Sequence, residues 1–390
     1  MTTQWMRVQN GVGVALIATG LVWGVAEQVS VQAQQSGASQ SSPDDGISSA
    51  MPKLENGKLQ IEPLGGPVTE AVNRWAAHTS KAEWLGYTVP AVAGKGSLGC
   101  WHGGNGVEGC GTCRLEREKT GSGVVLEDSG KPKVKLEGPR ELNVLYRAES
   151  GRIGQIRVVP SETTLDTGGL TLVWLGGVKP SGSVALLGKF VREASAAPAD
   201  HDKLSQAALS AIALHADQSA ERAMESFVLP NEPVSLRKET SFWLGEARGA
   251  EGLRVLQKMA QSDPSPEVRE QVAFGLSISQ EPGAITELIR MAHDDQVPKV
   301  RGQALFWLGQ RAGQKASHAI TSAIESDPDT DVKKKAVFAL SQMPRAEGVP
   351  RLIEVAQTNH NPVVRKEAMF WLAQSGDPKA LAFFEKVLSQ

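Results

Sequence analysis

The C-terminal half of the chain repeats itself every 32 residues, and this period constrains the fold more than any other feature. A basic residue recurs at this interval, preceded by Leu or Val and followed seven positions later by Leu. The five basic residues are Arg237, Arg269, Arg301, Lys333 and Arg365. Such a period, with apolar residues at helical spacing inside it, predicts a solenoid of stacked helix pairs.

Each unit is predicted to contain two helices joined by a turn. In one unit, residues 282–293 and residues 297–310 both show the apolar spacing of an amphipathic helix. A degenerate copy starts at Leu204, with Ile212 and Met224 at apolar positions of the full units. We therefore predict an all-α solenoid over residues 196–390, which consists of a degenerate N-terminal cap and five repeats.

An acidic residue stands six positions before the basic residue in three units, at Asp263, Asp295 and Asp327. At these residues the chain resembles the HEAT-repeat family, with short repeats similar to those of the bilin lyases. In that family the acidic and basic residues form a ladder that ties neighbouring repeats together. The resemblance implies this structural role for Asp263, Arg269, Asp295, Arg301, Asp327, Lys333 and Arg365. Asn231 and Asn359 replace the acid in the first and last units, so we expect weaker rungs at both ends.

Every unit carries a phenylalanine five positions after its basic residue. These residues are Phe242, Phe274, Phe306, Phe338 and Phe370. Successive helical residues lie about 100° apart, so the positions one before and three and seven after the basic residue face the partner helix. The phenylalanines point nearly away from that face, toward the side that is concave in a HEAT-like array. Trp307, one position after Phe306, lies at the flank of the buried face.

Two interpretations of the five rings stay open. In the first, they line a groove for a segment of a partner, with polar neighbours such as Gln271 and Gln303. In the second, each ring packs over the small residue three positions later, such as Gly309, and is buried between repeats. We predict the five phenylalanines as partner-binding residues, and the resemblance implies a protein or peptide partner because HEAT repeats mostly bind proteins.

The region before the repeats has a different pattern. Apolar and polar residues alternate there, as in residues 141–149, and turn-forming clusters separate the runs. Short strands at this spacing predict an antiparallel sheet, with helices at residues 68–82 and 181–195. The fold class that we predict is α+β multidomain: a β-rich antiparallel N-terminal domain at residues 54–195, followed by the all-α HEAT-like α-solenoid.

Residues 1–33 have the organisation of an export signal. Arg7 supplies a positive charge, and residues 11–26 form an apolar run of 16 residues, whereas a spanning helix needs about 20. Cleavage is expected after Ala33 or Ala26, and residues 34–53 are expected to form a flexible linker. The mature protein is then periplasmic or extracellular, and it contacts the membrane only if the signal stays as an uncleaved anchor.

All three cysteines lie in the Gly-rich segment of residues 100–113. An exported protein oxidises nearby thiols, which favours a disulfide from Cys100 to Cys110 or Cys113. Together, Cys100, His102, Cys110 and Cys113 also have the number and spacing of ligands that a zinc site requires. The third interpretation is a redox pair of Cys110 and Cys113, although such pairs usually begin a helix.

Composition and motifs exclude several classes of function. The 41 basic and 43 acidic residues give a net charge of −2, which argues against nucleic acid as a partner. The chain contains no G-x-S-x-G, H-E-x-x-H or phosphate-binding motif, and no His-Glu pair of the kind found in iron-dependent hydroxylases of HEAT architecture. We nominate no catalytic residue, so we expect a protein that is not an enzyme.

These observations predict an exported protein-interaction scaffold that binds a protein or peptide partner on the concave face of its solenoid. The alternative is an exported enzyme, or a metal or redox protein, whose chemistry lies in the loop from Cys100 to Cys113. The preferred function needs no cofactor, and zinc would be the cofactor of the metal-protein form of the alternative.

Overall fold

The computed structural model describes residues 51–93, 100–102, 106–108, 112–116, 140–194, 200–311 and 314–389. The expected export signal and nearly all of the expected linker lie outside these residues, so both stay predictions. Within the described ranges, no helix has the length and apolar character needed to cross a membrane.

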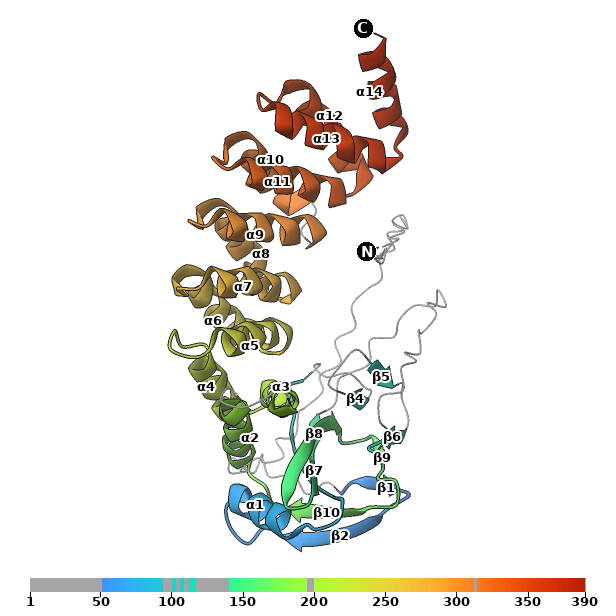
Figure 1. Ribbon diagram of the computed structural model, residues 1–390, viewed down its shortest axis with the longest axis vertical. Coiled ribbons are helices and arrows are strands. Elements are labelled where there is room, and N and C mark those ends of the chain that lie inside the picture. The colour runs from blue at the N-terminus through green and yellow to red at the C-terminus, as the bar shows by residue number, and fades with distance from the viewer. Residues whose placement is uncertain are drawn as a thin grey trace, which may run out of the picture. The chain divides into compact units, whose positions relative to one another are not determined.

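A five-stranded sheet with the strand order β2-β10-β3-β7-β8 forms the centre of the N-terminal region (Figure 1). Its strands are β2 (Lys58–Pro63), β3 (Glu83–Pro90), β7 (Glu141–Glu149), β8 (Arg152–Pro160) and β10 (Thr171–Gly176). Strand β7 pairs antiparallel with β3 and β8, whereas β10 pairs in parallel with β2 and β3. The predicted β-rich region is confirmed, but its sheet is mixed and not antiparallel.

Helix α1 (Val68–His78) explains the mixed sheet. It follows β2 and precedes β3, so it carries the chain back and lets both strands run in the same direction, with β10 between them. Alternating apolar residues indicate a half-buried strand but not the direction of its neighbour. The sequence pattern therefore could not distinguish a mixed sheet from an antiparallel one.

Two smaller sheets complete this region. They consist of β1 (Lys53–Glu55), β9 (Thr164–Asp166) and β6 (Thr112–Arg114), which pair in parallel, and of β4 (Cys100–His102) and β5 (Gly106–Glu108), which pair antiparallel. Buried side chains of β6 and β9 share a small core with the large sheet, in which Cys113 and Leu165 lie among Trp84 and Trp174.

The C-terminal region consists of stacked helix pairs, which confirms the predicted α-solenoid. The second helices of the repeats, which carry the recurring basic residue, are α5 (Val234–Ala247), α7 (Pro266–Ile278), α9 (Pro298–Arg311), α11 (Thr330–Gln342) and α13 (Pro362–Ser375). The first helices are α4 (Gln218–Phe227), α6 (Gly249–Ser262), α8 (Gly283–Asp294), α10 (Gln314–Ser326) and α12 (Arg345–Thr358), and α14 (Pro378–Leu388) follows the last repeat. Successive second helices contact one another in chain order and form one layer (Figure 1).

Helix α3 (Asp200–Leu214) takes the place of a second helix before α5. Leu204 and Ile212 are buried at the recurring apolar positions, but Ser205 and Ser210 replace the basic residue and the phenylalanine. Helix α3 also packs against β8 and against α2 (Pro180–Ala194). The hydrophobic core therefore continues from the β-rich region into the repeats.

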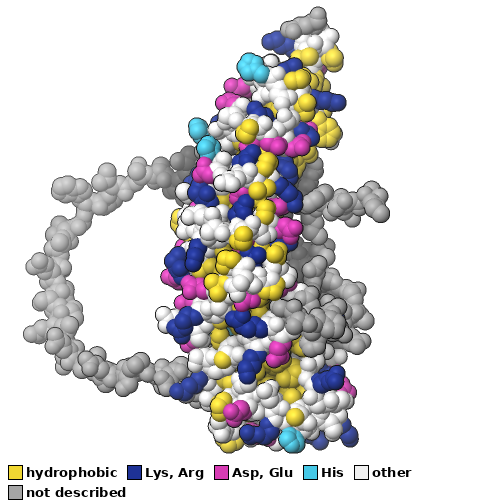
Figure 2. All heavy atoms as spheres, turned by 60° about the vertical axis from the view of Figure 1, so that its left-hand side comes forward, with side chains coloured by type: hydrophobic (Ala, Val, Ile, Leu, Met, Phe, Trp, Pro, Cys, Tyr) yellow, Lys and Arg dark blue, Asp and Glu magenta, His cyan; other side chains and the backbone are white. Residues whose placement is uncertain are grey.

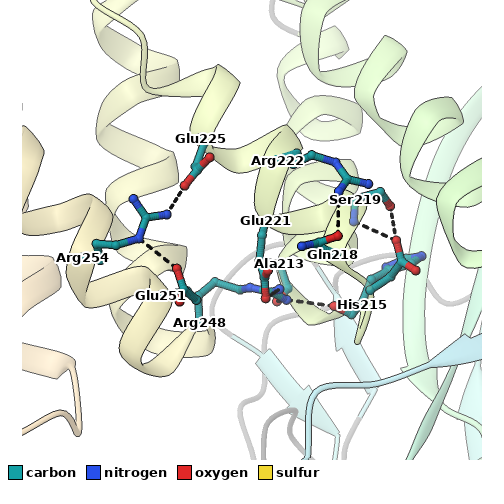
Figure 3. A network of polar contacts seen from close by, with 11 residues as sticks. Ala213, His215, Gln218, Ser219, Glu221, Arg222, Glu225, Arg248, Glu251 and Arg254 are labelled. Carbon is teal, nitrogen blue, oxygen red and sulfur yellow. Dashed lines mark hydrogen bonds and ion pairs between the residues drawn. The ribbon is translucent and has the colours of Figure 1, made fainter.

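The C-terminal end of α3 ties the two regions together. The Ala216 N–H, next to His215, donates to the carbonyl oxygen of Pro90 at the end of β3, at 2.9 Å. Arg248, between α5 and α6, donates from Nη1 to the carbonyl oxygen of His215 at 2.8 Å (Figure 3). The adjacent residues His215 and Ala216 thus join a strand, a helix end and the first full repeat.

A buried chain of hydrogen-bonded polar side chains starts at His215. His215 Nε2 lies 2.8 Å from Ser183 Oγ of α2. The hydroxyl of Ser183 lies 2.8 Å from Tyr87 Oη, which lies 2.8 Å from Tyr146 Oη. All four side chains are fully buried. Burial lowers the pKa of His215 to about 4, so its imidazole is neutral in the folded protein at neutral pH.

We expect the protein to lose stability as the pH falls from about 6.5 to about 4. The pKa of His215 is near 6.5 in the unfolded chain and about 4 in the folded one, so the unfolded state binds the extra proton in this window. The free energy of unfolding should decrease by about 3 kcal/mol across it. Urea titrations at a series of pH values measure the decrease, and a His215→Gln variant should lack most of it. Equal slopes in the two proteins would contradict this explanation.

Candidate functional site

Buried ion pairs connect successive repeats. Arg269 Nε donates to Asp295 Oδ2 at 2.7 Å, and Arg301 Nε donates to Asp327 Oδ2 at 2.7 Å. In each pair the arginine belongs to one repeat and the aspartate to the next. Each arginine also donates to a carbonyl of its own repeat, as Arg269 Nη1 does to Asp263 O at 2.8 Å. Hydrogen bonds to the aspartates raise the pKa of Arg269 and of Arg301 above the usual value.

The aspartates also shape the turn between the two helices of a repeat. Asp295 Oδ1 accepts from the N–H of Val297 at 2.9 Å, and Asp327 Oδ1 accepts from the N–H of Asp329 at 2.8 Å. Such turns position the chain for the start of the following helix. Each of these carboxylates therefore holds the turn before the second helix of its own repeat and also binds the arginine of the preceding repeat.

At the N-terminal end, the ladder differs from the expectation. Arg237 forms an ion pair with Asp263 of the second repeat, and both side chains are at most 4% exposed. Because the partner comes from the following repeat, Asn231 in the first repeat does not weaken this rung.

At the C-terminal end, the rungs lack a carboxylate. Lys333 Nζ donates to the carbonyl oxygen of Glu325 at 2.6 Å, and Arg365 Nη1 donates to the carbonyl oxygen of Asn359 at 2.8 Å. The repeat that follows Lys333 has Asn359 where an aspartate would otherwise stand. The weak rungs therefore lie at this end.

The five phenylalanines predicted to bind a partner lie in one row with three tryptophans, which we name the aromatic row. In order along the array it consists of Trp243, Phe242, Phe274, Trp307, Phe306, Phe338, Trp371 and Phe370. Ring centroids of successive members are 4.7–6.0 Å apart. Phe370 is 52% exposed, and the other rings are half-buried. The rings thus pack on one another across repeats and still present a surface, and their role in binding stays a prediction.

Glycine brings some second helices close together. A Cβ atom on Gly245 of α5 would lie 2.1 Å from the carbonyl oxygen of Gly275 in α7, so no larger residue fits there. At this junction Phe242 and Phe274 stack directly, with centroids 6.0 Å apart. The junction of α9 and α11 is built in the same way, with Gly309 against Ala339 and a direct stack of Phe306 on Phe338 at 5.8 Å.

Tryptophan separates the rings at the two other junctions. Trp307 of α9 lies 4.7 Å from Phe274 of α7, and Trp371 of α13 lies 4.8 Å from Phe338 of α11, measured between ring centroids. The structural period is therefore two repeats, from residue 307 to residue 371. The 32-residue alignment did not predict this two-repeat period. The signal is present in the sequence, because the residue after each phenylalanine is Trp, Gly, Trp, Ala and Trp in turn.

A hollow of about 430 Å³ opens on the aromatic row at the first tryptophan junction. Phe274 and Trp307 form its apolar wall, and Gln271 and Gln303 line it with charged residues of both signs. Two of these, Lys299 and Glu270, form an ion pair at 2.9 Å. The indole Nε1 of Trp307 is buried and has no hydrogen-bond partner among the residues that the structure describes. The hollow suits a group with an apolar face and a hydrogen-bond acceptor.

The cysteine-rich segment is described only in part. Cys100 and His102 belong to β4 through their main chain, but their side chains and the whole of Cys110 lie outside the described residues. Cys113, in β6, is fully buried. The zinc and redox interpretations of this segment therefore stay untested.

Comparison with known proteins identifies the repeats. Residues 225–309 and 317–390 match the family described as HEAT repeats. No curated protein matches the chain in sequence. Among solved structures, the chain is similar to the complex of CpcE and CpcF of phycocyanin lyase from Nostoc sp. PCC7120, with 19% identity, a TM-score of 0.32 and coverage of 40% of this chain and 99% of that one.

Two further solved structures are similar at the same level. Human deoxyhypusine hydroxylase in complex with glycerol is 17% identical, with a TM-score of 0.28 and coverage of 53% of this chain and 90% of that one. A designed armadillo repeat protein in complex with the peptide (KR)4 is 16% identical, with a TM-score of 0.29 and coverage of 49% and 99%.

Replacing Arg269 by Ala should lower the free energy of unfolding by about 3 kcal/mol, because the nearly buried Asp295 would keep its charge without a partner. Replacing Lys333 by Ala should cost less than about 1 kcal/mol, since that lysine donates to a main-chain carbonyl and faces no aspartate of the next repeat. Urea unfolding followed by circular dichroism measures both. Similar losses in the two variants would count against the ladder as the source of coupling.

Proposed function

Because residues 225–309 and 317–390 of this chain are HEAT repeats, we propose that they form an exported scaffold that binds a segment of a partner protein along the aromatic row. The observation that carries this proposal is the continuity of the row, in which eight rings touch one another across five repeats. A row that runs along the array suits a ligand that is itself long and narrow.

The core of the repeats does not include the five phenylalanine rings. In α9, the space toward the partner helix is filled by Val300, Ala304 and Leu308, all fully buried, whereas Phe306 is half-buried. Covering apolar surface is worth about 25 cal/mol per Å². Contiguous half-exposed aromatic surface on a soluble fold is typical of a binding site.

The distribution of charge supports recognition through apolar contacts and hydrogen bonds. Lys and Arg side chains are interspersed with Asp and Glu side chains over the face of the molecule shown in Figure 2. The hollow likewise contains charges of both signs, such as Lys299 and Glu270. Gln271 and Gln303 beside them each offer a donor and an acceptor, as a peptide backbone requires.

The proposal includes export. It is supported by the apolar run that follows Arg7 and by the three cysteines of residues 100–113, whose expected disulfide suits an oxidising compartment. The mass of the mature protein from its native host should correspond to cleavage after Ala33 or Ala26, and alkylation should find two of the three cysteines oxidised. A full-length chain with three free thiols would contradict export.

Single substitutions in the row separate binding from folding. Replacing Phe306 by Ser should cost about 1–2 kcal/mol of stability, because the ring is half-exposed. It should weaken binding of the partner by about 30-fold, since central aromatic residues contribute about 2 kcal/mol at interfaces. Replacing Trp307 by Ser should cost about 3 kcal/mol, because Trp307 also packs against the core. Melting temperatures and capture of the partner from envelope extracts measure these effects.

A matched control lies outside the row. Leu381 in α14 is 62% exposed, so a Leu381→Ser variant removes a similar exposed apolar group. It should capture the partner as well as the unmodified chain does. If Phe306→Ser and Leu381→Ser captured the partner equally well, the row would not be the binding site.

A further inference from the structure

The two tryptophan junctions differ in one hydrogen bond. Trp371 Nε1 donates to Glu367 Oε1, four residues earlier in the same helix, at 2.9 Å. In α9 the equivalent residue is Gln303, and the Nε1 atom of Trp307 is buried without a hydrogen-bond partner among the described residues. A buried donor without a partner is costly. The junction between α7 and α9 therefore offers an N–H group that the junction between α11 and α13 has already used.

The surroundings of this donor indicate a neutral ligand. Phe274 and Trp307 supply ring surface in the hollow, and Lys299 is already paired with Glu270. The remaining lining charges, Lys238 and Glu267, have opposite signs. The lining therefore carries two positive and two negative charges and gives no net attraction to a ligand of either sign. An uncharged segment with a carbonyl group does not depend on net charge, and its carbonyl oxygen can accept from the Trp307 N–H.

The spacing of the repeats selects the backbone conformation of such a segment. Packed helices are about 8–10 Å apart, so a ring contact between neighbouring second helices, alternately Phe on Phe and Phe on Trp, recurs at about that distance. A polyproline II helix has three residues per turn and a rise of about 3.1 Å, and it presents the same face every 9 Å or so. A β-strand presents the same face at intervals of about 7 Å, which is shorter than the spacing of the helices, so its side chains would not match successive ring contacts. The carbonyl groups of polyproline II make no internal hydrogen bonds, so they are free to accept.

We propose that the aromatic row binds a proline-rich segment of the partner protein in the polyproline II conformation. One turn of the segment occupies the hollow between α7 and α9, where a carbonyl oxygen accepts from Trp307 Nε1 and a proline ring packs on Phe274. The indole N–H, which is buried in the unliganded chain, becomes accessible when the segment binds. This proposal rests on the proposed function and specifies the class of partner.

The test uses the full chain, a peptide of about twelve prolines and a Gly-Ser peptide of equal length, which lacks a preformed helix. Isothermal titration calorimetry should detect binding of the proline peptide and none of the Gly-Ser peptide. Gln303→Glu should weaken binding about tenfold, because the carboxylate would take the Trp307 N–H as Glu367 takes that of Trp371. Melting temperatures verify that each variant is folded.

Gln271→Glu is the matched control. It places the same charge in the same hollow, but the residue four positions later is Gly275, which has no indole to bind. It should weaken binding less than Gln303→Glu does, because it alters one amide of the hollow but leaves the Trp307 N–H available to the segment. Equal losses in Gln271→Glu and Gln303→Glu would assign the effect to charge and overturn the role of Trp307.

A further variant keeps the proposal testable if Gln303→Glu does not fold. Phe274→Leu keeps an apolar side chain but removes the ring, and it should weaken binding of the proline peptide several-fold. Equal binding of the proline and Gly-Ser peptides, or binding of a chitin oligosaccharide in place of the proline peptide, would overturn the proposal. If the native partner were captured through Phe306 while the proline peptide did not bind, this inference would fail and the proposed function would stand.

Discussion

A helix pair in this array can bury its apolar face only against the next pair, and everything C-terminal to α3 depends on this contact between neighbours. The ion pairs reinforce it, because Arg269 and Arg301 each form an ion pair with the aspartate of the following repeat. The first full repeat has no such neighbour before it. Helix α3 supplies the missing surface and is itself held by β8 and α2. The mixed sheet thus closes the array at its N-terminal end.

Much of this fold could be predicted from the sequence because it is periodic. Val300, Ala304 and Leu308 are buried where the helical spacing places them, and the β-rich character of the first region follows from alternation. The joint at His215 could not be predicted, because a single histidine in a degenerate repeat belongs to no pattern. It contacts Ser183 and Arg248 directly and Tyr87 through Ser183, and only the folded structure brings these distant residues together.

The candidate site was predictable in position but not in detail. Helical geometry placed the phenylalanines on one surface, yet it could not state whether neighbouring rings stack or are separated. That choice depends on the next residue, which is Gly275 at a close junction and Trp307 at a separated one. The ladder shows the same limit. Its acidic and basic residues stand six apart in sequence, but the pairs that form, such as Arg269 with Asp295, are 26 residues apart.

The alternation of a small residue, Gly275 or Ala339, with tryptophan makes two repeats, and not one, the smallest part of this array that can be exchanged. Loss of α7 with its first helix would set the Gly245 surface of α5, shaped for Gly275, against the large ring of Trp307. Loss or duplication of two successive repeats would keep every junction matched. Arrays of this type should therefore change length through evolution, or be extended by design, in steps of two repeats.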